Sequence, residues 1–149
     1  MGQTCLQQGF CIDTSALIDM TYYPQDVFSK LWADMGLVAD SGLLISPKEV
    51  YREIGKKYEE DLQRWVKSHS DMFIPLDEDQ FKIAQSIIRD FDGLIDINKQ
   101  IPAADPFVIA LAQSKGDWVV VTSETISTNK YKPKIQNVCM SLDIRYITL

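Results

Sequence analysis

The sequence lacks the features that would place the protein in a membrane or in the secretory pathway. No apolar run within its 149 residues approaches the roughly 20 that a membrane-spanning helix needs. The first residues show no basic segment followed by an apolar stretch, so we expect no secretory signal. The three cysteines are an odd number without C-x-x-C spacing, which argues against a disulfide framework and a zinc knuckle. We therefore expect reduced thiols, a cytoplasmic protein and no membrane partner.

Several kinds of catalytic site are also missing from the sequence. It has no glycine-rich phosphate loop, no G-x-S-x-G nucleophile turn and no paired histidines for zinc. The one histidine, His69, is flanked by serines, and this context predicts a solvated surface position. Chemistry that depends on a histidine base or a zinc ion is therefore not expected.

The charge is acidic overall but unevenly distributed. The formal net charge is -6, which counts against nucleic-acid binding, since that function rewards basic surfaces. Residues 59–96 contain ten acidic and four basic side chains, which leaves eleven of each in the rest of the chain. The acidity thus belongs to one middle segment, and the segments that carry the motifs below are neutral on balance.

Short apolar runs alternate with amphipathic segments along the chain. We expect strands over 10–12, 43–45, 118–121 and 144–148, with a strand or a simple connection at 72–75. Helices are expected over 16–20, 25–39, 58–68, 77–92, 103–114 and 137–142, with Thr14 or Ser15 as the cap of the first. Another opens with Ser46 as its N-cap, Pro47 as its first residue and Glu49 placed to close a capping box with Ser46, and it ends at Gly55. This alternation predicts an α/β fold, a three-layer α/β/α sandwich with a mostly parallel central sheet. One domain would span 10–149, and residues 1–9 would be an N-terminal tail.

Three acidic residues are expected near strand ends on one edge of that sheet. Asp13 directly follows the first strand, and Glu124 follows the strand 118–121 by three positions. Ligands of open α/β sheets bind outside the carboxyl ends of the strands, so these two acids should share that edge. Asp105 opens a helix, where an acid either caps the helix dipole or joins the other two acids in a site.

Two glutamates, Glu49 and Glu53, lie one helical turn apart and share a face. Like charges at this spacing repel, so a counter-charge is expected. Lys48, Lys56 and Lys57 could supply it on a solvated face. A divalent cation is the alternative, because hard carboxylate oxygens suit Mg²⁺ and Mn²⁺.

Hydroxyl and lysine side chains accompany the acids. Ser15 and Thr122 either orient carboxylates by hydrogen bonds or serve as caps and turn formers. Lys130, Lys132 and Lys134 follow Glu124 in a polar segment. They either form a solvated loop or contact substrate phosphates beside a metal site.

The motifs, taken in order, resemble a known family. Ile12–Ile18 (IDTSALI) is similar to the opening motif of PIN domains, the VapC-like toxin ribonucleases among them. Ile45–Pro47 with Val50–Ile54 resembles the second motif, a glutamate within a helix. Ala104–Ala112 resembles the third, an aspartate that leads a helix. Val119–Glu124 resembles the fourth, an acid after a strand and Thr-x. The resemblance spans roughly residues 10–148 and is closest to an uncharacterised PIN-like branch.

The resemblance implies a Mg²⁺- or Mn²⁺-dependent hydrolase of phosphodiesters, an endoribonuclease with RNA as its substrate. Asp13 and Asp105 would be direct metal ligands, and Glu53 and Glu124 would bind directly or through water. Relatives of this kind include toxins with an antitoxin partner. Two departures affect the site. Glu124 stands where many PIN domains have aspartate, and Glu49 competes with Glu53 for the second motif; Glu53 is preferred because an apolar residue follows it.

Other functions stay open at this point. A non-catalytic PIN-like module that binds RNA or protein would keep the fold without turnover. A phosphotransfer domain of the receiver or aspartyl-phosphatase type also places an aspartate after the first strand, but no second acid follows Asp13 closely. Leu31, Trp32 and Met35 share an apolar helix face, which either forms a homodimer contact or fills the core of the monomer.

Overall fold

The computed structural model describes residues 8–55, 58–91, 104–116, 118–124, 128 and 133–149. The loop expected at 95–102 lies outside these ranges. The helices and strands in the described ranges are, in chain order, β1 (Phe10–Ile12), α1 (Thr14–Asp19), η1 (Met20–Tyr22, a 3₁₀ helix), α2 (Ser29–Asp40), β2 (Leu44–Pro47), α3 (Lys48–Ile54), α4 (Glu60–Ser68), η2 (Ser70–Met72, also 3₁₀), β3 (Phe73–Ile74), α5 (Glu78–Asp90), α6 (Asp105–Ser114), β4 (Val119–Val121), α7 (Ile135–Ser141) and β5 (Tyr146–Ile147).

The strands form one parallel sheet in the order β3-β2-β1-β4-β5. β1 is central: Cys11 pairs with Ile45 of β2 on one side and with Val120 of β4 on the other. The predicted parallel sheet is therefore confirmed. β2 and β4 are wholly buried, as expected for strands that are covered on both faces.

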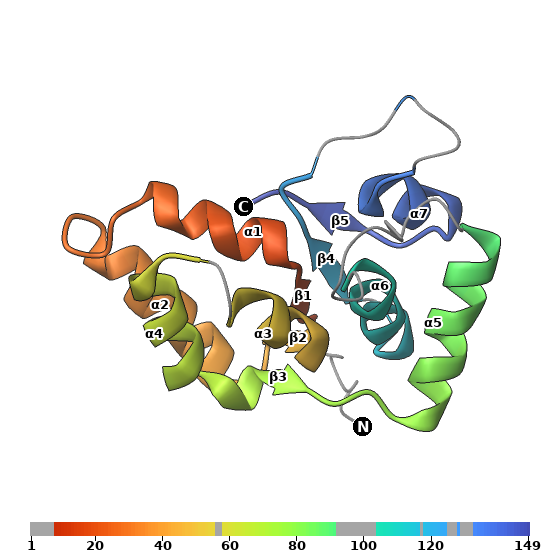
Figure 1. Cartoon of the computed structure of the whole chain (residues 1–149), viewed down its shortest axis with the longest axis horizontal. Helices are drawn as coiled ribbons and strands as arrows, with labels where there is room; N and C mark the ends of the chain where they lie inside the picture. Colours follow the sequence, from red (N-terminus) through yellow and green to blue (C-terminus); the bar gives the residue numbers. More distant parts are fainter. Residues whose placement is uncertain (1–7, 56–57, 92–103, 117, 125–127, 129–132) are drawn as a thin grey trace, which may run out of the picture.

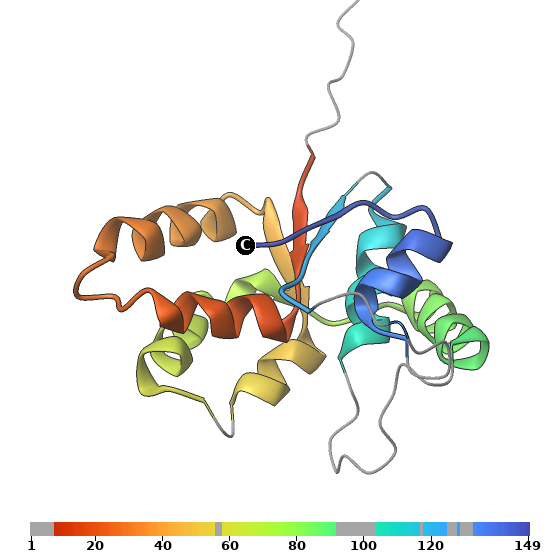
Figure 2. The ribbon, with the colours of Figure 1, turned by 90° about the horizontal axis from the view of Figure 1, so that it is seen from above.

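Helices cover both faces of the sheet and complete three layers. In Figure 1, α1–α4 lie to one side of the strands and α5–α7 to the other, and Figure 2 shows the same division from above. Parallel crossovers are right-handed, so the helices change face when the chain reverses its direction across the sheet. That reversal occurs after β3, when the chain passes over β2 and β1 to β4. The topological switch point consequently lies between β1 and β4.

The starts of α2 and α3 are among those that differ from the sequence prediction. α2 begins at Ser29, four residues later than expected, with Phe28 as its N-cap residue. α3 begins at Lys48, so Pro47 is not its first residue but the last of β2 and the N-cap, in an extended conformation. Ser46 is fully buried, and its hydroxyl donates to the Ile12 carbonyl over 2.6 Å. The predicted capping box between Ser46 and Glu49 is therefore wrong, because the hydroxyl bridges two strands instead.

The core of the α1–α4 side contains two tryptophans, and the partly buried histidine packs on one of them. Trp32 is 2% exposed, and its ring meets that of Trp65 edge to face at 6.3 Å. His69 stacks on Trp65 with ring centroids 4.4 Å apart, and its Nδ1 lies 2.9 Å from the Trp65 carbonyl oxygen. The solvated position predicted for His69 is therefore wrong. Leu31 and Met35 are partly buried and also pack against this core, which favours the alternative that these side chains fill the monomer, while the homodimer stays a prediction.

None of the helices in the described ranges has both the length and the apolarity that a membrane crossing requires.

Candidate active site

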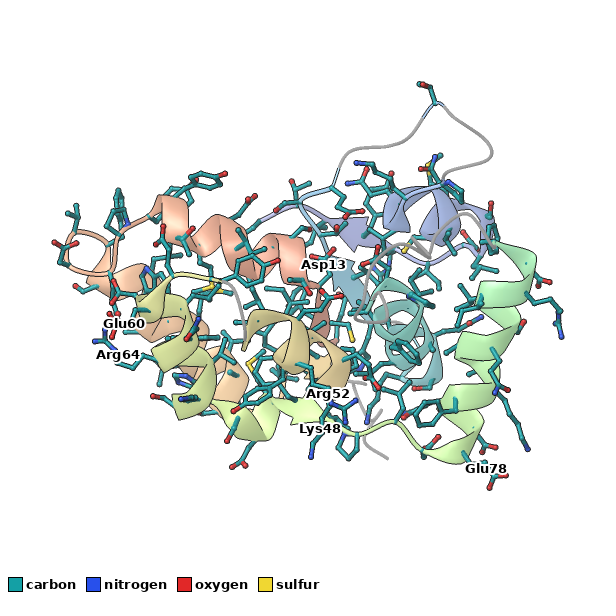
Figure 3. All side chains as sticks on the ribbon, viewed as in Figure 1. Asp13, Lys48, Arg52, Glu60, Arg64 and Glu78 are labelled. Atoms are coloured by element: carbon teal, nitrogen blue, oxygen red, sulfur yellow. The ribbon has the colours of Figure 1, made fainter. Side chains whose placement is uncertain are left out.

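Asp13 lies at the switch point, immediately after β1. Its backbone N–H donates to the Val121 carbonyl of β4 over 3.0 Å, which extends the strand pairing by one residue. Its side chain caps α1: Oδ1 accepts the Ala16 N–H at 2.9 Å. Asp13, rather than the predicted Thr14 or Ser15, is thus the N-cap. The residue is 1% exposed, and Figure 3 places it at the centre of the molecule.

A compact hydroxyl network holds the Asp13 carboxylate. Thr122, directly after β4, donates to Oδ2 over 2.6 Å. Ser15 is within hydrogen-bond distance of both carboxylate oxygens, at 2.8 and 3.0 Å. Ser15 Oγ also accepts the Ser123 N–H at 3.0 Å, and Thr122 Oγ1 accepts the Glu124 N–H at 3.2 Å. Ser15 and Thr122 therefore orient the carboxylate, the role that sequence analysis had left open.

The surroundings make the ionised form of Asp13 unfavourable. Burial raises the pKa of its carboxyl from 3.8 to about 6, and the Glu124 charge acts in the same direction. The hydrogen bonds from Thr122, Ala16 and Ser15 oppose this by lowering the pKa. A carboxylate in such a place is stabilised by any cation that reaches it.

Glu53 connects three parts of the site. Its Oε2 accepts the Thr14 hydroxyl at 2.5 Å, next to Asp13 in the chain. Its Oε1 accepts the N–H of Ala104 at 2.9 Å, and Ala104 is the N-cap residue of α6. Glu53 thereby ties α3 to the residues that adjoin Asp13 and Asp105.

Asp105 is the first residue of α6, and Glu124 follows β4 by three positions. Burial raises the pKa of the Cys139 thiol to about 12, and the charges of Asp13 and Asp105 act in the same direction, so both acids are near enough to act on this side chain of α7. Glu124 is near enough to act on the pKa of Asp13. Glu53 thus contacts the neighbours of Asp13 and Asp105, and Glu124 acts on Asp13 through its charge, while the convergence of all four acids on one ion stays a prediction.

Two buried polar atoms nearby have no hydrogen-bond partner among the described residues: Glu49 Oε2 and Ser123 Oγ. No ion pair joins Asp13, Glu49, Glu53 or Glu124 to a lysine or arginine of the described ranges. Within those ranges, no three His, Cys, Asp or Glu side chains are close enough together to hold a metal ion as they stand. Carboxylate oxygens suit a hard cation, but in the described residues these side chains are not close enough to one another to bind the same ion.

The lysines proposed to contact substrate are placed only in part. Lys130 and Lys132 lie outside the described residues. Lys134 is exposed at the start of α7, where its backbone N–H donates to Asn137 Oδ1 at 3.0 Å.

Sequence analysis missed one partner of the acids, Thr14. Thr14 was considered as a helix cap, and its contact with Glu53 spans 39 residues. A hydroxyl next to the strand-end acid was the only available signal.

Residues 10–149 match the family described as "Domain of unknown function (DUF4411)". The chain belongs to this DUF4411 family. The match begins at the first residue of β1 and includes every acid of the candidate site. No curated protein matches the sequence.

Proposed function

We propose that this DUF4411 protein is a Mg²⁺- or Mn²⁺-dependent phosphodiesterase, an endoribonuclease of the PIN-like kind. The observation that carries the proposal is the buried Asp13 carboxylate at the β1–β4 switch point, where Glu53 binds the neighbours of Asp13 and Asp105 and the Glu124 charge acts on Asp13. Sites at switch points bind the ligands of open α/β sheets. Asp13, Glu53 and Glu124 form no ion pair with a lysine or arginine of the described ranges, which favours a divalent cation as their counter-charge.

The residues around Asp13 would have distinct roles in binding the ion. Asp13, Asp105 and Glu124 would hold the ion, with Glu53 or Glu49 completing the oxygen ligands. A hard ion bound there supplies charge stabilisation at the phosphate and lowers the pKa of water. Ser15 and Thr122 fix the orientation of the Asp13 carboxylate, as partners of metal ligands commonly do. Glu53 also holds the α6 N-terminus, and Asp105 with it, against α3.

Cleavage of single-stranded RNA by the purified protein tests the proposal. With Mn²⁺ the wild type should cleave, EDTA should stop cleavage, and Asp13→Ala should be inactive while its circular dichroism spectrum stays native. The double variant Glu60→Gln plus Glu78→Gln is the control, since both residues lie far from Asp13 in Figure 3. Equal cleavage by Asp13→Ala would place the activity elsewhere. Binding of RNA without cleavage over a broad panel of sequences would favour a non-catalytic module.

A further inference from the structure

Helix α3 carries acids and bases on different faces. Successive residues of a helix are about 100° apart around its axis. Lys48 and Arg52 therefore form one exposed stripe, and the stripe of Glu49 and Glu53 lies about 100° further around. Val50 and Ile54, on a third face of the helix, are buried in the core. Figure 3 shows Lys48 and Arg52 on the side of α3 that faces away from Asp13.

The two basic side chains have no ion-pair partner in the described part of the chain. Basic residues on other helices do: Lys30 pairs with Asp34 at 2.8 Å, and Arg64 with Asp61 at 3.1 Å. Lys48 and Arg52 instead face each other one turn apart, about 6 Å along the axis. Like charges at this spacing are unfavourable, so an anion bound between them would be stabilised.

A groove of about 620 Å³ runs beside this stripe, between α3 and the edge of the sheet. Its lining consists of Lys48, Tyr51, Arg52, Ser70, Asp71, Phe73 and Pro75. Tyr51 is half-buried and meets Phe73 edge to face at 5.2 Å, which gives the groove an aromatic wall. Cations next to an aromatic surface are the combination that binds single-stranded nucleic acid, through its phosphates and by base stacking.

We propose that this groove binds the backbone of a single-stranded RNA substrate, with Lys48 and Arg52 on its phosphates and Tyr51 beside a base. This assignment of a substrate site rests on the proposed function. One helix then presents the glutamates to the site of cleavage and the cations to the flanking strand. Asp71 is exposed in the same groove and weakens its attraction for phosphate.

Fluorescence anisotropy of a short labelled oligouridylate, measured in EDTA so that nothing is cleaved, tests the groove. Lys48→Gln plus Arg52→Gln should weaken binding about tenfold. The logarithm of the association constant should also depend less steeply on the logarithm of salt concentration, with a slope smaller in magnitude by about 1.4, or 0.7 for each lost contact. Asp71→Asn should tighten binding. The matched control, Lys82→Gln plus Arg89→Gln on α5, removes the same charge elsewhere and should change little. An equal loss in the control, or an unchanged salt slope, would overturn the proposal.

A small diester separates this proposal from the proposed function. With Mn²⁺, hydrolysis of bis(p-nitrophenyl) phosphate reports the acidic site alone, so the groove variant should keep it while its KM for RNA rises. If the wild type hydrolyses neither substrate but its RNA binding still depends on Lys48 and Arg52, the proposed nuclease activity is wrong and the RNA-binding groove is supported. If the groove variant loses both hydrolyses equally, Lys48 and Arg52 support the acidic site and the groove assignment fails.

Discussion

The Thr122 hydroxyl donates a 2.6 Å hydrogen bond to Asp13 Oδ2 and so joins the residues that follow the two adjacent central strands. Both residues are almost completely buried. The bond holds the carboxylate in one orientation but does not neutralise it, and the pKa of Asp13 remains raised to about 6. An acid that is costly to ionise is thus built into the centre of the sheet.

Asp13→Asn should be more stable than the wild type at neutral pH when no divalent ion is present. The carboxyl has a pKa of about 6 in the folded protein and 3.8 in the unfolded chain, so unfolding between these values releases a proton. Stability therefore falls as the pH rises through this window. This difference in pKa corresponds to about 3 kcal/mol in the free energy of unfolding. Asparagine does not ionise, and its oxygen can still accept the Ala16 N–H.

Urea unfolding in EDTA measures the effect. The free energy of unfolding of Asp13→Asn should exceed that of the wild type by about 2–3 kcal/mol near pH 7.5. This difference should disappear as the pH falls towards about 4. Leu or Ala at this position would confuse charge with packing, so asparagine is the informative substitution. A variant that is destabilised by the same amount at both pH values would show that hydrogen bonding, not ionisation, dominates at Asp13.

Mn²⁺ or Mg²⁺ should raise the melting temperature of the wild type, because a ligand that binds only the folded state stabilises it. Asp13→Asn plus Asp105→Asn should lose most of this response. Differential scanning fluorimetry over a range of metal concentrations measures it, and Glu60→Gln plus Glu78→Gln serves as the charge-matched control. An equal response in all three proteins would place the ion elsewhere.

The fold could be predicted from the sequence because each buried strand is a short apolar run between amphipathic helices. The strand-end acids Asp13 and Glu124 could be placed for the same reason, since parallel strands end at one edge. Ser46 was misread because a hydroxyl before proline suits a helix cap as well as a strand end. Its bond to Ile12 depends on which strands are neighbours, and local sequence does not contain that information.

Long-range contacts limited the reading of the site in the same way. Glu53 reaches Ala104 across 51 positions, so only the folded chain shows that it positions the α6 N-terminus. His69 looked solvated because its neighbours in the sequence are polar. The surface that buries it belongs to α2 and α4, where Gly36 leaves room for the imidazole ring.

Gly36→Ala should destabilise the protein even though alanine favours helices. A Cβ at this position would lie 2.7 Å from His69 Nε2, closer than packed atoms tolerate. The ring cannot retreat easily, since it stacks on Trp65 and its Nδ1 contacts the Trp65 carbonyl. Overpacking of this kind costs about 1–3 kcal/mol.

A double-mutant cycle identifies the cause. In a His69→Ala background the clash is gone, so adding Gly36→Ala should stabilise the protein by up to about 1 kcal/mol, the usual helix preference. Urea unfolding of the four proteins gives the coupling energy. If Gly36→Ala has the same effect with and without His69, the imidazole is not what requires glycine here.

The last prediction separates the two glutamates of α3. Glu53 accepts one hydrogen bond on each oxygen, from groups next to Asp13 and Asp105, whereas Glu49 Oε2 is buried without a partner in the described residues. Glu53→Gln keeps an acceptor for Ala104 but removes the charge that binds the neighbours of both aspartates, Thr14 and Ala104. It should stay folded and lose RNA cleavage by about 100-fold or more, and added Mn²⁺ should not restore it. Glu49→Gln removes a charge that makes no such bond in the described residues, so it should need more Mn²⁺ for half-maximal activity and recover most of kcat at saturation. Metal titrations of both variants under identical conditions distinguish the two roles.

Should Glu49→Gln be inactive at every Mn²⁺ concentration while Glu53→Gln responds to added metal, Glu49 would be the ligand and Glu53 a positioning residue for α6.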